Sequence, residues 1–327
     1  MRRTCRPSLG VFFDSYGDAQ HRVRYGTPQP GPVGSALTPR LTTAAPTTPG
    51  HPYLTALDGL GNTLVQTDFT NASILSQVVV GNTSGPYGVR PTLTGPENEY
   101  WVAQNAASIA IANLASQRVT ANIGTPSVPA SATPVGIVFT NDGTTAFEAF
   151  RLSSADASGN LGLLVVFDAV NKAVTSTLAV KNGPSAFVMS PDGLTAYLMG
   201  TSGTITYYDV LSGTADLSLS TFTPGQGGGY PGQGTPVFVH PDGTRMFWNV
   251  GVQLESFDLN RHRITAQFNS GLPTTSGVSM SLSQDGSVAI LSGGAGDEVF
   301  LDTRSGAPVG FHKSPAAAQP FATLPQP

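Results

Sequence analysis

Carboxylate side chains recur in this sequence at a regular spacing, which raises the question of acid–base or metal chemistry. Asp-Gly pairs follow short apolar runs at residues 142–143, 192–193, 242–243 and 285–286. A lone Asp ends a later apolar run of each unit, at Asp168, Asp209, Asp258 and Asp302. Two converging carboxylates can share a proton or bind a divalent cation. A catalytic pair is needed only once, however, whereas this pair recurs in separate units that we expect to lie far apart.

We therefore interpret the recurring carboxylates as turn residues. Gly supplies the positive φ that a tight hairpin turn requires, and Asp caps such a turn through nearby backbone groups. The lone Asp can accept hydrogen bonds from the amides of the turn that follows it, as in the LSG after Asp209 and the RSG after Asp302.

The elements that carry these residues form a repeat. The lone Asp follows the Asp-Gly pair after 16 or 17 residues in three units, and after 26 in the unit that contains the extra residues 150–160. Two weaker units lie upstream. One has Glu97-Asn98 in the position of the Asp-Gly pair and Asn113 in that of the lone Asp, and the other has Asp68 in the position of the lone Asp. Each unit contains four short runs with strand composition, such as SAFVMS, LTAYLM, TITYYD and LSLSTF, and none has helical periodicity. The sequence predicts an all-β fold, a β-propeller of six or seven four-stranded blades.

The order SPDG, then Tyr-Leu or Tyr-Trp-Val, then a strand ending in Asp resembles the YVTN-type β-propeller repeats of bacterial and archaeal surface proteins. The unit EYWVAQNAASIAIANLASQRVTANIG is the most similar, with WVAQN in the place of the family's Tyr-Val-Thr-Asn. The resemblance spans roughly residues 52–313. It implies the fold and little about function, because propellers host unrelated activities.

In such a blade the Asp-Gly turns lie on one face, and the connections between the second and third strands and between blades lie on the other. The irregular insertions 124–134, 150–160, 223–236 and 269–277 all fall on the second face, where we expect a partner to bind. Polar residues at or beside strand ends on that face are candidate binding residues: Gln104, Asn105, Glu148, Arg151, Asp156, Tyr230, Asn249 and Asp297. They either form a polar pocket or are solvated loop residues, and Glu148 with Arg151 is either a site or a surface ion pair.

No catalytic or metal-ligating residue can be named from the sequence, and no cofactor is predicted. The five histidines have no ligand spacing, no nucleophile elbow is present, and GQGGGYPGQG lacks the Lys-Ser/Thr ending of a phosphate loop. Trp101 and Trp248 occupy second-strand positions and are expected to pack between blades.

We divide the chain into an N-terminal arm (1–50), the propeller (51–315) and a C-terminal tail (316–327). The Pro- and Thr-rich residues 26–50 read as a linker, and LGVFFDS with HRVRYG can form a hairpin. That hairpin either completes a blade, or pairs with a neighbouring molecule in a homo-oligomer or filament, or the arm is only a tether.

Charged residues make up only 11% of the chain, the net charge is −4, and there is one cysteine. So few Lys and Arg make nucleic acid a poor partner, and no stretch is long enough for a membrane helix. The Ser-, Thr- and Gly-rich composition favours an extracellular, cell-surface or periplasmic location, although no signal sequence is visible.

Two functions remain open. The first is a non-catalytic structural, assembly or binding module whose partner is a protein or glycan. The second is a metal-dependent hydrolase resembling the propeller lactonases, which requires several oxygen or nitrogen ligands to converge on one ion.

Overall fold

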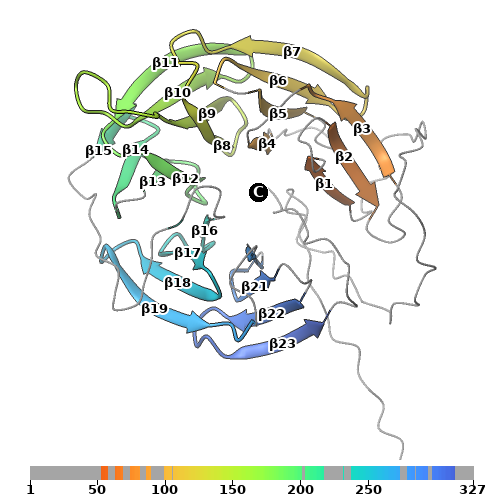
Figure 1. Cartoon of the computed structure of the whole chain (residues 1–327), viewed down its shortest axis with the longest axis vertical. Coiled ribbons are helices and arrows are strands. Elements are labelled where there is room, and N and C mark those ends of the chain that lie inside the picture. Colours follow the sequence, from red (N-terminus) through yellow and green to blue (C-terminus); the bar gives the residue numbers. More distant parts are fainter. Residues whose placement is uncertain are drawn as a thin grey trace, which may run out of the picture.

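The computed structural model is all-β, which confirms the predicted fold class. It describes residues 53–57, 63–68, 74–81, 86–89, 99–104, 106–200, 203–216, 231, 237–272, 278–283, 285–293 and 297–313. Every regular element among them is a strand, and the strands form six antiparallel sheets. Figure 1 shows these sheets following one another in chain order around a common centre. This arrangement is consistent with a β-propeller.

The first three sheets cover residues 53–180. The first has three strands: β1 (Tyr53–Leu57), β2 (Thr63–Asp68) and β3 (Ile74–Val79). The second has four: β4 (Tyr87–Val89), β5 (Glu99–Gln104), β6 (Ser108–Asn113) and β7 (Arg118–Gly124). The third also has four: β8 (Thr133–Phe139), β9 (Thr145–Arg151), β10 (Gly162–Asp168) and β11 (Ala173–Val180).

The remaining sheets have four strands each. The fourth contains β12 (Pro184–Met189), β13 (Thr195–Gly200), β14 (Ile205–Asp209) and β15 (Thr214–Asp216). The fifth contains β16 (Val237–Val239), β17 (Arg245–Val250), β18 (Gln253–Asp258) and β19 (Arg263–Asn269). The sixth contains β20 (Ser279–Leu282), β21 (Val288–Ser292), β22 (Asp297–Asp302) and β23 (Pro308–Lys313).

The position of one strand differs from the prediction. The fourth strand of the fourth sheet was expected at LSLSTF, but β15 begins directly after the turn that follows Asp209. Gly213, with φ of 66°, closes that turn, so Thr214 already pairs with Asp209. Residues 217–222 lie outside the described residues.

The hydrophobic core lies between neighbouring sheets. Trp101 of β5 is fully buried and makes edge-to-face contacts with Phe139 and Phe167 of the third sheet, at ring-centroid distances of 5.4 and 5.6 Å. Trp248 of β17 is equally buried, in a cluster with Tyr197 and other residues of the fourth sheet. The prediction that both tryptophans pack between sheets is confirmed, and their burial fixes adjacent sheets against each other.

The strand connections lie at two opposite ends of the sheets, because all strand pairs are antiparallel. Turns between first and second and between third and fourth strands form one end, here called the turn face. Connections between second and third strands and between sheets form the other end, the loop face. Two of the predicted insertions, 124–134 and 150–160, are loop-face connections, as predicted. Of the other two, residues 223–236 except Pro231 and residues 273–277 lie outside the described residues.

Candidate functional site

The Asp-Gly pairs are turn residues on the turn face. Their glycines have positive φ, as the turn requires: 65° at Gly143, 71° at Gly193, 70° at Gly243 and 72° at Gly286. The aspartate caps the turn locally. Asp192, for example, accepts hydrogen bonds from the Leu194 amide at 3.0 Å and from the Ser190 hydroxyl.

The lone Asp of each unit also serves a turn. Asp209 accepts a hydrogen bond from the Ser212 amide at 2.7 Å, and Asp302 accepts one from the Ser305 amide at the same distance. Asn113, in the corresponding slot of the second sheet, accepts one from the Ser116 amide at 2.7 Å. The prediction that these residues bind the amides of the next turn is confirmed.

These hydrogen bonds stabilise the ionised carboxylates. The side-chain hydrogen bond from Thr140, followed by the Thr144 amide, lowers the pKa of Asp142. The Ser190 hydroxyl, followed by the Leu194 amide, lowers the pKa of Asp192 in the same way. A carboxylate held in its ionised form by turn donors is a poor general acid at neutral pH.

Replacing Asp192 with Ala should lower the free energy of unfolding at pH 7 by about 0.5–1 kcal/mol, a small value because the carboxylate is mostly solvated. Since the folded-state pKa is depressed, this contribution exists above the unfolded pKa and is lost as pH falls through the folded one. Denaturant unfolding at pH 7 and pH 2.5 checks both points. A difference that persists unchanged at pH 2.5 would contradict the role of the ionised carboxylate.

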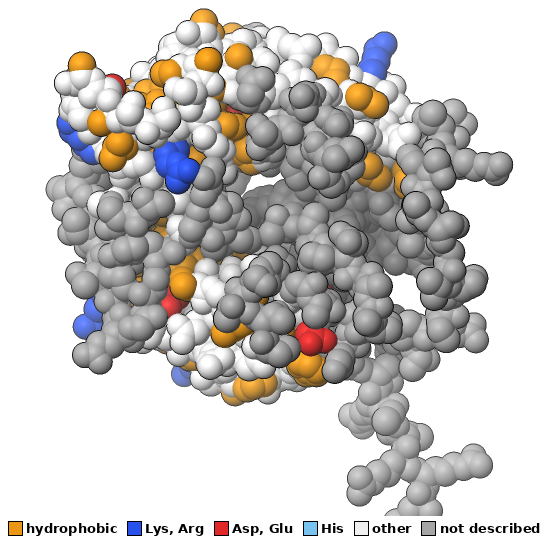
Figure 2. Space-filling view, viewed as in Figure 1, with side chains coloured by type: hydrophobic (Ala, Val, Ile, Leu, Met, Phe, Trp, Pro, Cys, Tyr) orange, Lys and Arg blue, Asp and Glu red, His pale blue; other side chains and the backbone are white. Residues whose placement is uncertain are grey.

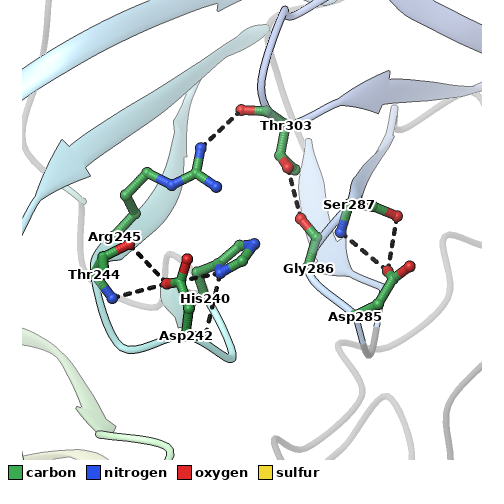
Figure 3. A network of polar contacts seen from close by, with 8 residues as sticks. All are labelled: His240, Asp242, Thr244, Arg245, Asp285, Gly286, Ser287 and Thr303. Carbon is green, nitrogen blue, oxygen red and sulfur yellow. Dashed lines mark hydrogen bonds and ion pairs between the residues drawn. The ribbon is translucent and has the colours of Figure 1, made fainter.

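Turns of neighbouring sheets contact each other on the turn face through residues other than the repeated carboxylates. Figure 3 shows His240 of the fifth sheet, whose Nδ1 lies 2.8 Å from Asp242 Oδ1. A Cβ added to Gly286 of the sixth sheet would lie 2.5 Å from His240 Nε2. The Arg245 guanidinium donates to the Thr303 carbonyl at 3.4 Å, and the Thr303 hydroxyl donates to the Gly286 carbonyl at 2.6 Å. This histidine therefore joins two turns, and its Nε2 packs against backbone.

A similar contact links the third and fourth sheets, where the Asn141 amide donates to the Pro191 carbonyl at 2.8 Å. Two pairs of neighbouring Asp-Gly turns, those of the third and fourth sheets and those of the fifth and sixth, are therefore in contact on the turn face.

The predicted binding residues of the loop face are distributed over several sheets. Gln104 bridges the first two sheets by donating to the Val80 carbonyl. The Asn249 amide donates to the Gly251 and Val278 carbonyls, each at 3.2 Å. Asp297 is buried at the start of β22, and Asn105 and Tyr230 lie outside the described residues. Gln104 and Asn249 therefore also join neighbouring elements of the structure.

Glu148 lies in the middle of β9 and is 0% exposed, so its expected position near a strand end is wrong. Neither carboxyl oxygen has a hydrogen-bond partner, and burial raises the pKa of Glu148 well above its ordinary value. The proposed surface ion pair with Arg151 is absent. Residues 148 and 151 point to opposite sides of the strand, since side chains alternate in direction.

Asp156 lies in the connection between β9 and β10, where hydrogen bonds join its carboxylate to the backbone of the same loop. Asp156 accepts hydrogen bonds from the Ser158 and Asn160 amides at 2.8 and 2.9 Å and from the Asn160 side chain at 2.8 Å. These bonds, the Asn160 side chain first, lower the pKa of Asp156. Lys181 ties the same loop to β11 by donating to the Ser158 carbonyl at 2.7 Å.

A loop within the third sheet meets the connection between the second and third sheets here. The Ser153 hydroxyl donates to the Ser131 hydroxyl at 3.2 Å, which joins the connection between β9 and β10 to that between β7 and β8. We define the loop patch as this group of exposed or half-exposed polar residues: Ser131, Arg151, Ser153, Asp156, Ser158 and Lys181. Sequence reasoning found Arg151 and Asp156 but missed Lys181 and the serines. The rarity of lysine was the one available signal, since only three occur in the chain.

Charged side chains are sparse elsewhere as well. Figure 2 shows only scattered Lys, Arg, Asp and Glu side chains over the described part of the face in view. Among the described residues, no group of three or more His, Cys, Asp or Glu side chains is placed to hold a metal ion. No helix in the described part of the chain is long and apolar enough to cross a membrane.

No protein-family model matches the chain, and no curated protein is similar enough to show a shared family.

Proposed function

We propose that the chain is a β-propeller of the YVTN-repeat type, with six or seven four-stranded blades, that acts as a non-catalytic binding or assembly module. The ring-like succession of antiparallel sheets in Figure 1 supports the fold. The use of the recurring carboxylates in turns supports the absence of a catalytic role for them. The low charge supports an extracellular, cell-surface or periplasmic location.

The observation that best supports a binding function is that hydrogen bonds hold the loops of the loop patch in place. Asp156, Lys181 and Ser153 hold two loops through hydrogen bonds, while the loop residues around them remain exposed. A recognition loop that is fixed before binding loses less conformational entropy when a partner binds. Loops on a rigid scaffold are the usual place for such recognition.

The chemistry of the loop patch suits a protein or glycan with acidic groups. Arg151 and Lys181 provide two cations against the single carboxylate of Asp156, and the serine hydroxyls can donate and accept hydrogen bonds. The N-terminal arm, which lies outside the described residues, is the proposed assembly element.

Arrays of acidic and neutral oligosaccharides and of acidic peptides, probed with the full chain, test the binding function. We expect acidic probes to be retained, and binding to fall at least tenfold in the double variant Arg151→Ala/Lys181→Ala. Arg261→Ala on the turn face is the matched control, because its side chain is 67% exposed and its loss leaves the loop patch intact. Equal binding by the double variant, or metal-dependent turnover of an ester or lactone, would contradict the proposal.

A further inference from the structure

Glu148 of β9 lies in the interface between the second and third sheets. Successive side chains of a strand point to opposite faces, so Glu148 shares its face with Ala146 and Phe150, and both belong to the apolar cluster between these sheets. The second sheet contributes Trp101 and Ile111 to the same cluster. The carboxyl group, which is fully buried and has no hydrogen-bond partner, therefore lies where the two sheets pack together.

Both loops of the loop patch are anchored in this cluster. Val128 and Ala132, from the connection between β7 and β8, are buried in it, and Leu152, from the connection between β9 and β10, packs against it. The hydrogen bond between Ser153 and Ser131, which joins the loops, is formed by the residues next to two of these anchors. The packing of the cluster therefore helps to fix both loops.

Among the described residues, the strands around Glu148 offer it no counter-ion. Glu99 of β5 faces the same interface at its turn-face end, where it pairs with Lys172 at 3.3 Å. Tyr100 of β5 points to the first sheet, and the side chain of Tyr87 in β4 lies outside the described residues. β6, β8 and β12 have no charged residue, and those of β7 and β10 stand at the turn-face ends: Arg118 and Asp168.

The described loops offer no counter-ion either. Arg151 points to the other face of β9, where its Cγ lies 3.5 Å from a Cβ added to Gly183 in the connection to the fourth sheet. Lys181 donates to the Ser158 carbonyl, and residues 124–134 carry no charge. An ionised carboxylate at position 148 therefore has to be hydrated, which requires the packing between the sheets to loosen.

We propose that Glu148 makes the loop patch responsive to pH: ionisation of its carboxyl group loosens the cluster between the second and third sheets and releases the two loops anchored there. Burial raises the pKa of Glu148 well above its ordinary value. The loops are therefore fixed at acidic pH and are released as the pH rises through the raised pKa, which reaches about 8–9 for some buried glutamates. The consequence for binding rests on the function proposed above.

Hydrogen exchange of the full chain, measured by mass spectrometry, tests the release of the loops. The amides of Ala132, Leu152 and Asp156 donate to carbonyls within these loops, each at 2.9 Å. Their protection, corrected for the intrinsic exchange rate, should fall about tenfold between pH 6 and pH 9. The Ser190 amide on the turn face, which donates to the Thr195 carbonyl at 2.8 Å, is the internal control and should keep its protection.

Two variants that cannot ionise at position 148 are the matched controls. Glu148→Gln keeps the shape of the side chain, and Glu148→Leu removes the buried polar group. Both should keep the loop amides protected at pH 9. Constant protection in the wild type over the whole pH range, or an equal fall in both variants, would overturn the proposal.

Probe binding separates this inference from the proposed function. Acidic probes should be released from the wild type as the pH rises from 6 to 9, and Glu148→Gln should retain them. Probe retention together with protection that does not change with pH would overturn only the pH response. Falling protection without retention of any probe would contradict only the binding function.

Discussion

Replacing Glu148 with Leu is expected to raise the free energy of unfolding at pH 7 by about 2–4 kcal/mol. The carboxyl group is fully buried, and neither oxygen has a hydrogen-bond partner. Burial raises its pKa well above the ordinary value, so the folded protein favours the neutral form over a pH range in which the unfolded chain ionises. A leucine removes that penalty at nearly the same volume.

The surroundings of Glu148 are apolar. Its cross-strand partners are Ile137 and Val165, and both belong to the buried cluster that contains Trp101 of the second sheet. The corresponding second-strand positions, aligned by the register with the closing Asp or Asn, hold apolar residues in the other four-stranded sheets: Val102, Leu198, Trp248 and Leu291. Leucine at position 148 therefore restores the pattern of the repeat.

The sign of the pH dependence follows from the raised pKa. Below the unfolded pKa both states are protonated, so Glu148 adds no pH-dependent penalty, and only the cost of burying an unpaired polar group remains. Above it the unfolded chain releases a proton that the folded protein retains, so stability falls by up to about 1.4 kcal/mol per pH unit until the folded pKa is reached. The difference between wild type and Glu148→Leu should therefore widen from pH 4.5 to pH 8.

Urea unfolding of the wild type, Glu148→Leu and Glu148→Gln across that range measures the effect. The glutamine variant is the control for titration, because it keeps the shape and a buried polar group but cannot ionise. It should lose the pH dependence without gaining the stability of the leucine variant. Parallel stability profiles of wild type and Glu148→Leu would show that Glu148 is not held neutral.

The second large effect is expected at Gly286, where substitution with Ala should lower the free energy of unfolding by about 3 kcal/mol. An added Cβ would lie 2.4 Å from His240 Cδ2 and 2.7 Å from Pro241 Cδ, so the contact between the turns of the fifth and sixth sheets must open. The positive φ of 72° adds backbone strain.

Gly243→Ala is the matched control for that substitution. Gly243 occupies the same place in its own Asp-Gly turn, has a φ of 70°, and nothing lies within 4 Å of an added Cβ. It should cost only about 1 kcal/mol, the penalty of the positive φ. Chemical denaturation of both variants isolates the contact between the turns, and equal losses would show that the contact contributes nothing.

The fold was largely predictable because the repeat places the same local signals in each unit. Asp209 and Asp302 accept hydrogen bonds from backbone amides three residues further along the chain. Such local hydrogen bonds can be predicted from the sequence because they do not depend on the rest of the molecule. The burial of Trp101 and Trp248 followed from their second-strand positions.

The loop patch was less predictable because it depends on long-range contacts. Lys181 reaches Ser158 from another connection, and Ser153 meets Ser131 across two loops. Glu148 was misplaced because its sequence neighbours, Arg151 and the insertion, suggested a strand end. Comparison with Val102 and Leu198 at the same register would have identified an apolar position.

A crystal structure of the full chain, grown with millimolar calcium, would show whether the recurring carboxylates serve turns or a metal ion. We expect a closed ring of antiparallel sheets in which Asp168, Asp209, Asp258 and Asp302 each bind the amides of their own turn, with no cation among the carboxylates. A calcium ion held by three or more Asp, Glu or Asn side chains would contradict the structural role of these residues and indicate a metal-dependent enzyme.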